Sequence, residues 1–270
     1  MTGVQTCALP IYLKDRVALV TGAAAGLGKK TACLLADCGA NIVIGDMDAL
    51  GGKETAKEIE KDLGVQAYAV TCDVTDYDQV KAMFDLAKEK FDRIDMVVNA
   101  AGICVYQMLH EADQRAVKKM IDINVNGTDN VDRLALTYMK DQHQGRVVNF
   151  ASVAGRGGSI LVPHYAMTKS AIINLTQSYA QLGAKYGLQY NSICPGIIKT
   201  EIWMKYLRQI IPGDASKQDV FFNQFCEDHI PLARPQETED IANGVLFLVS
   251  DLAKNITGQA LNVCGGMHMD

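Results

Sequence analysis

Residues 16–28 read RVALVTGAAAGLG, an apolar run that leads into three closely spaced glycines. The apolar run predicts a buried strand, and the segment that follows, KKTACLLADCGA, predicts a helix. In such a strand, turn and helix, Gly22 permits the tight turn and Gly26 lets backbone N–H groups approach a pyrophosphate. Gly28 permits close packing of the helix, and the positive N-terminus of this helix favours a bound phosphate. Leu27 lies within the same turn and is a further candidate contact to the cofactor. The stretch therefore predicts a dinucleotide-binding βα unit.

Apolar runs rich in Val and Ile continue to alternate with amphipathic segments of helical length along the chain. Runs that are hydrophobic throughout are typical of parallel strands covered by helices on both faces. We therefore expect an α/β fold of the Rossmann type, a doubly wound, seven-stranded parallel sheet in a single domain, with ligands at the carboxyl ends of the strands. The seven strand candidates are RVALVT, NIVIGD, VQAYAVTCDV, IDMVVNAA, RVVNFAS, LQYNSICPG and QALNVCG.

Two parts of the chain depart from this alternation. Residues 1–12 match neither the fold pattern nor a targeting signal, and TGVQTCALPI resembles the translation of a sequencing-library adapter. We expect residues 1–12 to be a non-native or disordered extension and residues 13–270 to be the folded domain. Residues 197–235 form a long stretch of mixed polarity, and we expect this stretch to be a lid over the substrate.

Composition excludes several classes of protein. The 270 residues are 49% hydrophobic and carry a formal net charge of −5, so nucleic acid and anionic membranes are not expected partners. The sequence has neither an apolar run of roughly 20 residues nor a signal peptide, so we expect a cytoplasmic protein. Eight cysteines and five histidines are dispersed without metal-ligand spacing. We therefore expect free thiols and no metal site.

The second strand candidate ends at Asp46, which follows the last glycine of the turn by eighteen positions (46 minus 28). A carboxylate at this place accepts hydrogen bonds from both ribose hydroxyls and repels a 2′-phosphate, so NAD is predicted over NADP. Asp48 is the alternative ribose partner.

A serine, a tyrosine and a lysine provide candidate catalytic groups. Ser152 follows a strand, and Tyr165 and Lys169 lie four residues apart on one face of a predicted helix. An ammonium beside a phenol lowers the pKa of the phenol, so Tyr165 is predicted to act as a general base. Ser152 is placed to orient the substrate oxygen.

The TG-x-x-x-G-x-G spacing and the Ser, Tyr and Lys pattern resemble the short-chain dehydrogenase/reductase family. The resemblance covers residues 13–269 and implies hydride transfer between a nicotinamide and a secondary alcohol or ketone. It also implies that Asn124 holds a water in a proton relay from Lys169, and that Lys169 reaches the ribose. A catalytically silent NAD-binding sensor is the non-enzymatic alternative.

Further cofactor residues follow from the same resemblance. Asp73 and Val74 would border the adenine, and the NAAG motif at 99–102 would border the adenosine, although Ala100 stands where the family has a second Asn. The other expected contacts are Asn99, Ala101 and Gly102 for the adenosine, and Pro195, Gly196, Ile198 and Thr200 for the nicotinamide carboxamide. Cys264 stands where the family usually has Asp, a departure without an explanation.

The resemblance is nearest to polyol and acetoin dehydrogenases, so the predicted substrate is a small polyol or an acetoin-like hydroxyketone. A hydroxysteroid dehydrogenase and a 3-oxoacyl-carrier-protein reductase are the alternatives. His164 and Trp203 are substrate-lining candidates, although His164 can equally face solvent and Trp203 can simply pack within the lid. Met204, Tyr206 and Leu207 are expected to extend the apolar cover. Apolar-faced segments 113–140 and 163–186 resemble the helices that pair across subunits in the family, and predict a homotetramer.

Overall fold

The computed structural model describes residues 11–270, apart from the side chain of Ile202. The predicted extension falls mostly on residues 1–10, which lie outside the described residues. Of its last two residues, Ile11 packs against the core and Tyr12 is exposed.

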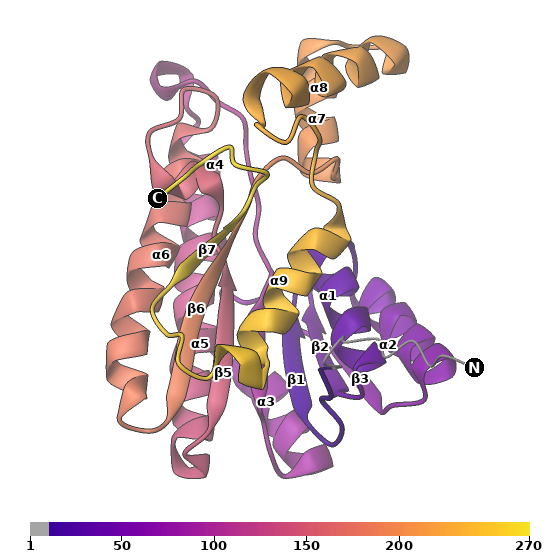
Figure 1. The fold of residues 1–270 in the computed structure, drawn as a ribbon, viewed down its shortest axis with the longest axis vertical. Coiled ribbons are helices and arrows are strands. Elements are labelled where there is room, and N and C mark those ends of the chain that lie inside the picture. The colour runs from indigo at the N-terminus through magenta and orange to yellow at the C-terminus, as the bar shows by residue number, and fades with distance from the viewer. Residues whose placement is uncertain (1–10) are drawn as a thin grey trace, which may run out of the picture.

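Within residues 11–270 the chain forms one seven-stranded parallel sheet, in the order β3-β2-β1-β4-β5-β6-β7 (Figure 1). The predicted doubly wound sheet is confirmed, and each strand falls within or next to its predicted apolar run. The strands are β1 (Val17–Thr21), β2 (Asn41–Asp46), β3 (Ala67–Thr71), β4 (Met96–Asn99), β5 (Gly145–Phe150), β6 (Leu188–Pro195) and β7 (Ala260–Val263).

Helices cover both faces of the sheet, which explains why most strand residues are apolar. One face packs against α1 (Gly26–Asp37), α2 (Ala49–Leu63) and α9 (Thr238–Val249). The other face packs against α3 (Tyr77–Phe91), α5 (Gly127–Met139) and α6 (Pro163–Ala184), with α4 (Gln114–Ile121) beside α6. Short turns of helix add η1 (Leu109–Glu111), the π-helical η2 (Asp122–Asn126), η3 (Lys140–Gln142), η4 (Val153–Arg156) and η5 (Asp251–Ala253).

A fully buried polar network joins four of these elements. The Asn99 amide donates to Asp132 Oδ1 at 3.0 Å and to Asn149 Oδ1 at 2.8 Å. Asn149 in turn donates to Asp132 Oδ2 at 2.8 Å and to Thr176 Oγ1 at 3.0 Å. Burial raises the pKa of Asp132 well above its usual range, and the amide hydrogen bonds oppose this only in part. The network fixes β4, β5, α5 and α6 relative to one another.

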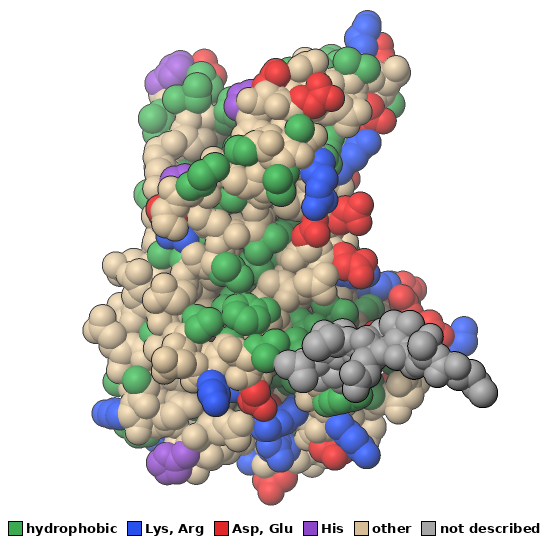
Figure 2. Space-filling view, in the orientation of Figure 1, with side chains coloured by type: hydrophobic (Ala, Val, Ile, Leu, Met, Phe, Trp, Pro, Cys, Tyr) green, Lys and Arg blue, Asp and Glu red, His purple; other side chains and the backbone are tan. Residues whose placement is uncertain are grey.

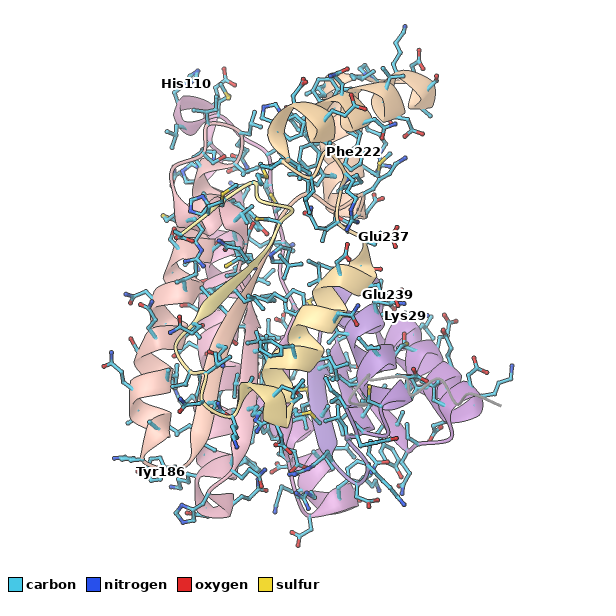
Figure 3. The ribbon with its side chains drawn as sticks, viewed as in Figure 1. Lys29, His110, Tyr186, Phe222, Glu237 and Glu239 are labelled. Carbon is cyan, nitrogen blue, oxygen red and sulfur yellow. The ribbon has the colours of Figure 1, made fainter. Side chains whose placement is uncertain are left out.

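The stretch predicted to be a lid contains two helices, α7 (Glu201–Ile210) and α8 (Ala215–His229), beyond the carboxyl ends of the strands (Figure 1). Their facing sides form a separate apolar cluster that includes Leu207, Phe222 and Cys226. Phe222, labelled in Figure 3, lies on α8 within this cluster. Met204 and Tyr206 pack against the same cluster. The two helices therefore bury one another's apolar faces.

The surface in Figure 2 carries acidic and basic side chains that are interspersed with one another. Among residues 11–270, no helix is both long enough and apolar enough to cross a membrane.

Candidate active site

Two adjacent cavities open at the carboxyl ends of the strands. They share Leu27, Ala100, Gly102 and Thr200 in their walls, so a ligand in one can extend into the other. The first cavity lies over β1, β2 and the N-terminus of α1, and the second lies between η4, α6 and α7. This is the edge at which doubly wound sheets bind ligands.

The glycine turn builds the floor of the first cavity. Gly22 has a φ of +68°, and a Cβ there would lie 2.7 Å from the backbone nitrogen of Ala101, so only glycine fits. At Gly26, with a φ of +58°, a Cβ would meet no atom within 4 Å and would project into open space. Ala25, the N-cap residue of α1, has no side-chain acceptor for the first N–H groups of the helix. An open cradle beside unpartnered N–H groups fits a pyrophosphate.

Asp46 is held toward this turn by two backbone donors. Its Oδ2 accepts a hydrogen bond from the backbone N–H of Ala24 at 2.9 Å, and its Oδ1 accepts from that of Asp48 at 2.9 Å. Asp48 uses its own carboxylate to cap α2 by accepting from the N–H of Gly51 at 3.0 Å. Both acids line the cavity, but Asp46 is the one tied to the glycine turn.

The remaining cofactor candidates divide into two groups. Asp73, Val74, Ala101 and Gly102 line the first cavity, with the Asp73 carboxylate accepting from Thr75, and Pro195, Gly196, Ile198 and Thr200 line the second. Asn99 does not face the cavity, because its side chain points into the buried network with Asp132. Its contribution to the site is to hold the strand end beneath Ala100.

Ser152, Tyr165 and Lys169 line the second cavity together. Ser152 precedes η4 and accepts from the N–H of Ala154 at 3.1 Å, which fixes its rotamer. Lys169 is buried and donates from Nζ to the carbonyl of Phe150 at 2.5 Å, and Nζ lies 5.5 Å from the ring centroid of Tyr165. Helix α6 thus presents phenol and ammonium on the face that meets the end of β5.

The pKa of Tyr165 shifts in the direction opposite to the one expected from the sequence. We expected the ammonium to lower the pKa of Tyr165, but burial raises it above its ordinary value, the nearby Cys104 adds to the rise, and the Ser152 hydroxyl opposes it. Burial also lowers the pKa of Lys169 to about 8. The expectation was wrong in direction because desolvation of the phenol outweighs a cation that is bonded to the Phe150 carbonyl.

Asn124 lies behind these residues, in the π-helical turn between α4 and α5. Its Oδ1 accepts from the N–H of Ile103 at 2.8 Å, and its Nδ2 donates to the carbonyl of Ile103 at 2.9 Å and to Thr168 Oγ1 at 3.0 Å. A Cβ on Gly102 would lie 3.2 Å from Asn124 Oδ1 and 3.6 Å from Lys169 Nζ. Any side chain at position 102 would therefore crowd both the amide and the ammonium.

This arrangement suits proton transfer at a substrate oxygen. Two hydroxyls, those of Ser152 and Tyr165, face one cavity, so one can hold the oxygen while the other gives or takes a proton. A bound nicotinamide dinucleotide would supply or accept the hydride at the carbon. Lys169 can stabilise the phenolate electrostatically, and exclusion of water by the apolar walls strengthens each polar contact.

One of the two predicted substrate-lining residues lies in the wall of the second cavity. Trp203 lines it, but His164 does not, although it neighbours Tyr165 in the sequence. The lining residues that the sequence analysis missed include Cys104, Tyr106, Ser159, Leu161, Val162, Phe225, Met267 and His268. Tyr106 stacks on Tyr206 with ring centroids 4.5 Å apart, and this contact joins the loop after β4 to α7. No local signal marks such residues, because only the fold brings them together.

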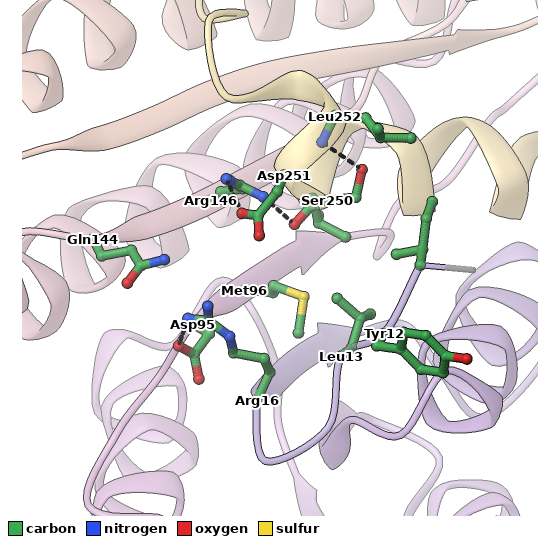
Figure 4. Close-up of a pocket in the computed structure, with 12 residues that line it drawn as sticks. Tyr12, Leu13, Arg16, Asp95, Met96, Gln144, Arg146, Ser250, Asp251 and Leu252 are labelled. Carbon is green, nitrogen blue, oxygen red and sulfur yellow. Dashed lines mark hydrogen bonds and ion pairs between the residues drawn. The ribbon is translucent and has the colours of Figure 1, made fainter. Parts of the chain in front are cut away.

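A third cavity lies at the opposite edge of the sheet, near the start of β1 and β5 (Figure 4). Arg16 pairs with Asp95 at 3.0 Å and Arg146 pairs with Asp251 at 2.9 Å, so its charges are compensated. Across residues 11–270, no group of three or more His, Cys, Asp or Glu side chains is arranged to hold a metal ion.

Comparison with known proteins agrees with this geometry. Residues 22–268 match the family model described as enoyl-(acyl carrier protein) reductase. The chain is 35% identical over 255 residues to a 3-oxoacyl-[acyl-carrier-protein] reductase of Staphylococcus aureus, covering 93% of this chain and 98% of that protein. It is 34% identical over 256 residues to a diacetyl reductase [(S)-acetoin forming] of Staphylococcus epidermidis, covering 94% and 98%.

Among solved structures, NAD⁺-bound xylitol dehydrogenase superposes with a TM-score of 0.88 at 30% identity, covering 94% of this chain and 99% of that one. These proteins span nearly the whole described chain, including the glycine turn and helices α6, α7 and α8. The chain is therefore an enzyme of the short-chain dehydrogenase/reductase family, an oxidoreductase that acts on alcohol and ketone groups with a nucleotide cofactor.

Proposed function

We propose that the enzyme is NAD-dependent and acts on a small secondary alcohol or ketone with a neighbouring oxygen, such as acetoin, diacetyl or a short polyol. In this proposal Tyr165 is the general acid and base, Ser152 orients the substrate oxygen, and Lys169 and Asn124 complete the proton path.

The size of the second cavity carries the substrate proposal. Its volume is about 360 Å³, and its walls include Pro195, Gly196 and Thr200, where the resemblance places the nicotinamide carboxamide. A nicotinamide ring and a substrate must share this space, which leaves room for a compact molecule. The rest of the wall is mostly apolar, with Tyr106, Ser159 and His268 as the polar side chains beyond Ser152, Tyr165 and Lys169. Few additional hydrogen-bond partners favour a four-carbon hydroxyketone over a long polyol.

Asp46 supports NAD as the cofactor. Its carboxylate is fixed by the N–H groups of Ala24 and Asp48 at the cavity edge, so it cannot swing away from a 2′-phosphate without losing both bonds. Lys29, the nearest basic residue after the turn, is paired with Glu58 at 2.6 Å.

A 3-oxoacyl thioester reductase is the second candidate, favoured by the 35% identity to the Staphylococcus aureus enzyme. A hydroxysteroid is the third alternative, and its rigid four-ring skeleton would need a long apolar groove, which the substrate panel below tests.

A homotetramer in a reducing, cytoplasmic compartment completes the proposal. Met167 and Leu182 of α6 are 48% and 45% exposed, which is compatible with a subunit interface along this helix. The seven cysteines among the described residues are free thiols, as a reducing compartment requires. Light scattering at micromolar concentration tests the assembly, and a monomer would contradict it.

The experiment is a substrate panel assayed with NADH and NADPH in one direction and NAD⁺ and NADP⁺ in the other. The panel contains diacetyl, acetoin, 2,3-butanediol, xylitol, acetoacetyl thioester and a hydroxysteroid. The expected result is the highest kcat/KM for diacetyl or acetoin with NADH. A hydroxysteroid preferred by more than about a hundredfold, or about 2.7 kcal/mol of transition-state stabilisation, would contradict the small-substrate proposal. Preference for acetoacetyl thioester with NADPH would select the second candidate.

A further inference from the structure

Residues 264–270 follow β7 and return over the second cavity, where Met267 and His268 form part of its wall. The return depends on Gly265 and Gly266, whose φ angles of +63° and +88° are left-handed. The segment has no strand or helix of its own. Backbone bonds support the turn, from the Met267 N–H to the Cys264 carbonyl at 3.2 Å and from the Leu232 N–H to the Gly265 carbonyl at 3.0 Å, and side-chain contacts add to them at the end of the segment.

Asp270 supplies these contacts. Its Oδ2 lies 3.3 Å from Arg156 Nη1 and 3.4 Å from His268 Nε2, and its Oδ1 accepts from Asn262 Nδ2 at 3.0 Å. The Asn262 amide also donates to the carbonyl of His268 at 3.3 Å. Arg156 donates from Nε to Asn262 Oδ1 at 3.1 Å and from Nη2 to the carbonyl of Ala260. Segment 264–270 is thus tied to β7 and to Arg156 by one connected group of polar contacts.

Arg156 is anchored next to the catalytic serine. It is the last residue of η4, the turn that Ser152 begins, and its side chain is only 15% exposed. The same turn packs closely on α6, because Ser170 Oγ donates to the carbonyl of Gly155 at 2.7 Å. The element that fixes Ser152 therefore also fixes the wall formed by segment 264–270.

We propose that Arg156 and Asp270 form a latch that holds Met267 and His268 in the wall of the substrate cavity, which makes both latch residues positioning residues for substrate affinity. This inference rests on the proposed function, because the wall is assigned to the alcohol or ketone. The latch residues do not line the dinucleotide cavity. The latch is therefore expected to affect substrate binding more than dinucleotide binding, because only the nicotinamide end of the dinucleotide enters the second cavity.

The test is a double-mutant cycle with Asp270→Asn, Arg156→Gln and the double variant, measured with diacetyl and NADH. The matched control is Asp251→Asn. Asp251 pairs with Arg146 at 2.9 Å at the opposite edge of the sheet, so this variant removes one charge of another Arg–Asp pair (Figure 4). Each single variant is expected to raise KM for diacetyl about threefold to fivefold with kcat within twofold. The double variant is expected to resemble the singles, because the two residues belong to one connected group of contacts.

Two further readouts do not depend on turnover. The Kd for NADH should change less than the KM for diacetyl in all variants, because most of the dinucleotide contacts lie in the first cavity. Trp203 is the one tryptophan of the chain and lines the same cavity, so its quenching by acrylamide should increase in the latch variants and not in Asp251→Asn. If the wild type turns over none of the panel substrates but the quenching pattern holds, the proposed function fails and the latch stands.

Unchanged KM and unchanged quenching in both single variants would overturn the latch. Three other results would also overturn the latch. They are a KM increase in the double variant equal to the product of the two single increases, an equal KM increase in Asp251→Asn, and a rise in the Kd for NADH as large as the rise in KM. A change in quenching with no change in KM, in a variant that does turn over diacetyl, would refute the role in substrate affinity.

Discussion

Nδ2 of Asn124 donates a hydrogen bond to Thr168 Oγ1 across 3.0 Å, and Thr168 is the residue directly before Lys169 on α6. Thr168 also donates to the carbonyl of Tyr165 at 2.8 Å. A side chain in the π-helical turn is therefore bonded to the helical turn that carries both the phenol and the ammonium. The same amide holds the loop after β4 through the N–H and carbonyl of Ile103.

Asn124→Ala is expected to lower both activity and stability. The substitution leaves the backbone N–H and carbonyl of Ile103 without their protein partners in a half-buried place, which costs roughly 1 kcal/mol. We expect kcat to fall by about tenfold or more, since the catalytic helix loses one of its attachments. Steady-state kinetics and thermal unfolding measure the two effects. Asn126→Ala is the control, because Asn126 lies in the same turn but is exposed and bonds only to Asp122, at 3.1 Å. Equal effects of the two substitutions would contradict this account.

Tyr165→Phe is expected to reduce kcat by about a hundredfold or more while the Kd for NADH stays unchanged, since the hydroxyl serves proton transfer. Lys169→Ala should lose activity and also some affinity for the dinucleotide, because the family resemblance places this side chain at the ribose. Turnover assays combined with calorimetric titration of NADH distinguish the two variants. Substantial residual turnover in Tyr165→Phe would rule out Tyr165 as the proton donor and acceptor.

The fold could be predicted from the sequence because its signals are local. The runs of β1 to β7 are mostly apolar, and the glycine spacing that marks the turn lies within one βα unit. The close approach that excludes a side chain at Gly22 is not local, because Ala101 comes from the loop after β4. Spacing along α6 likewise indicated that Tyr165 and Lys169 share a face.

Other features depend on packing between distant segments. His164 neighbours Tyr165 in the sequence, but consecutive helical residues point about 100° apart, and it does not line the cavity. His268 lines it instead, after a return of the chain from β7. The raised pKa of Tyr165 could not be predicted either, because it depends on burial by residues from several elements.

Asp46→Ala is expected to narrow the preference for NAD over NADP. We expect the wild type to prefer NAD by at least about tenfold, equivalent to about 1.4 kcal/mol, because a fixed carboxylate repels a 2′-phosphate. The ratio of kcat/KM for the two cofactors measures this preference. Asp48→Ala serves as the comparison: it removes the α2 cap at a cost of about 1 kcal/mol of stability, but should leave the cofactor ratio intact. If Asp48→Ala changes the ratio and Asp46→Ala does not, Asp48 is the ribose partner.

Asp132→Asn is expected to stabilise the protein at neutral pH. The pKa of Asp132 is raised in the folded state, so the folded protein keeps a proton that the unfolded chain releases above its ordinary pKa of 3.8. Stability contributed by this group is therefore present at acidic pH and is lost as pH rises toward the folded pKa, by up to about 1.4 kcal/mol per pH unit.

Asparagine resembles the protonated acid in being neutral. It replaces one of the two acceptor oxygens with a donor, so the Asn99 amide must turn to bring its Oδ1, which has no donor among the described residues, to the new amide. Urea unfolding between pH 4 and pH 8 should therefore show a gain for Asp132→Asn that grows with pH. Asp95→Asn is the opposite control. Burial raises the pKa of Asp95, but bonds from Arg93, Val17 and Arg16 outweigh it and lower the pKa overall. Asp95→Asn should have a lower free energy of unfolding than the wild type at neutral pH, and this difference should become smaller as pH falls. A pH-independent difference between Asp132→Asn and the wild type would show that Asp132 is ionised in the folded protein at neutral pH.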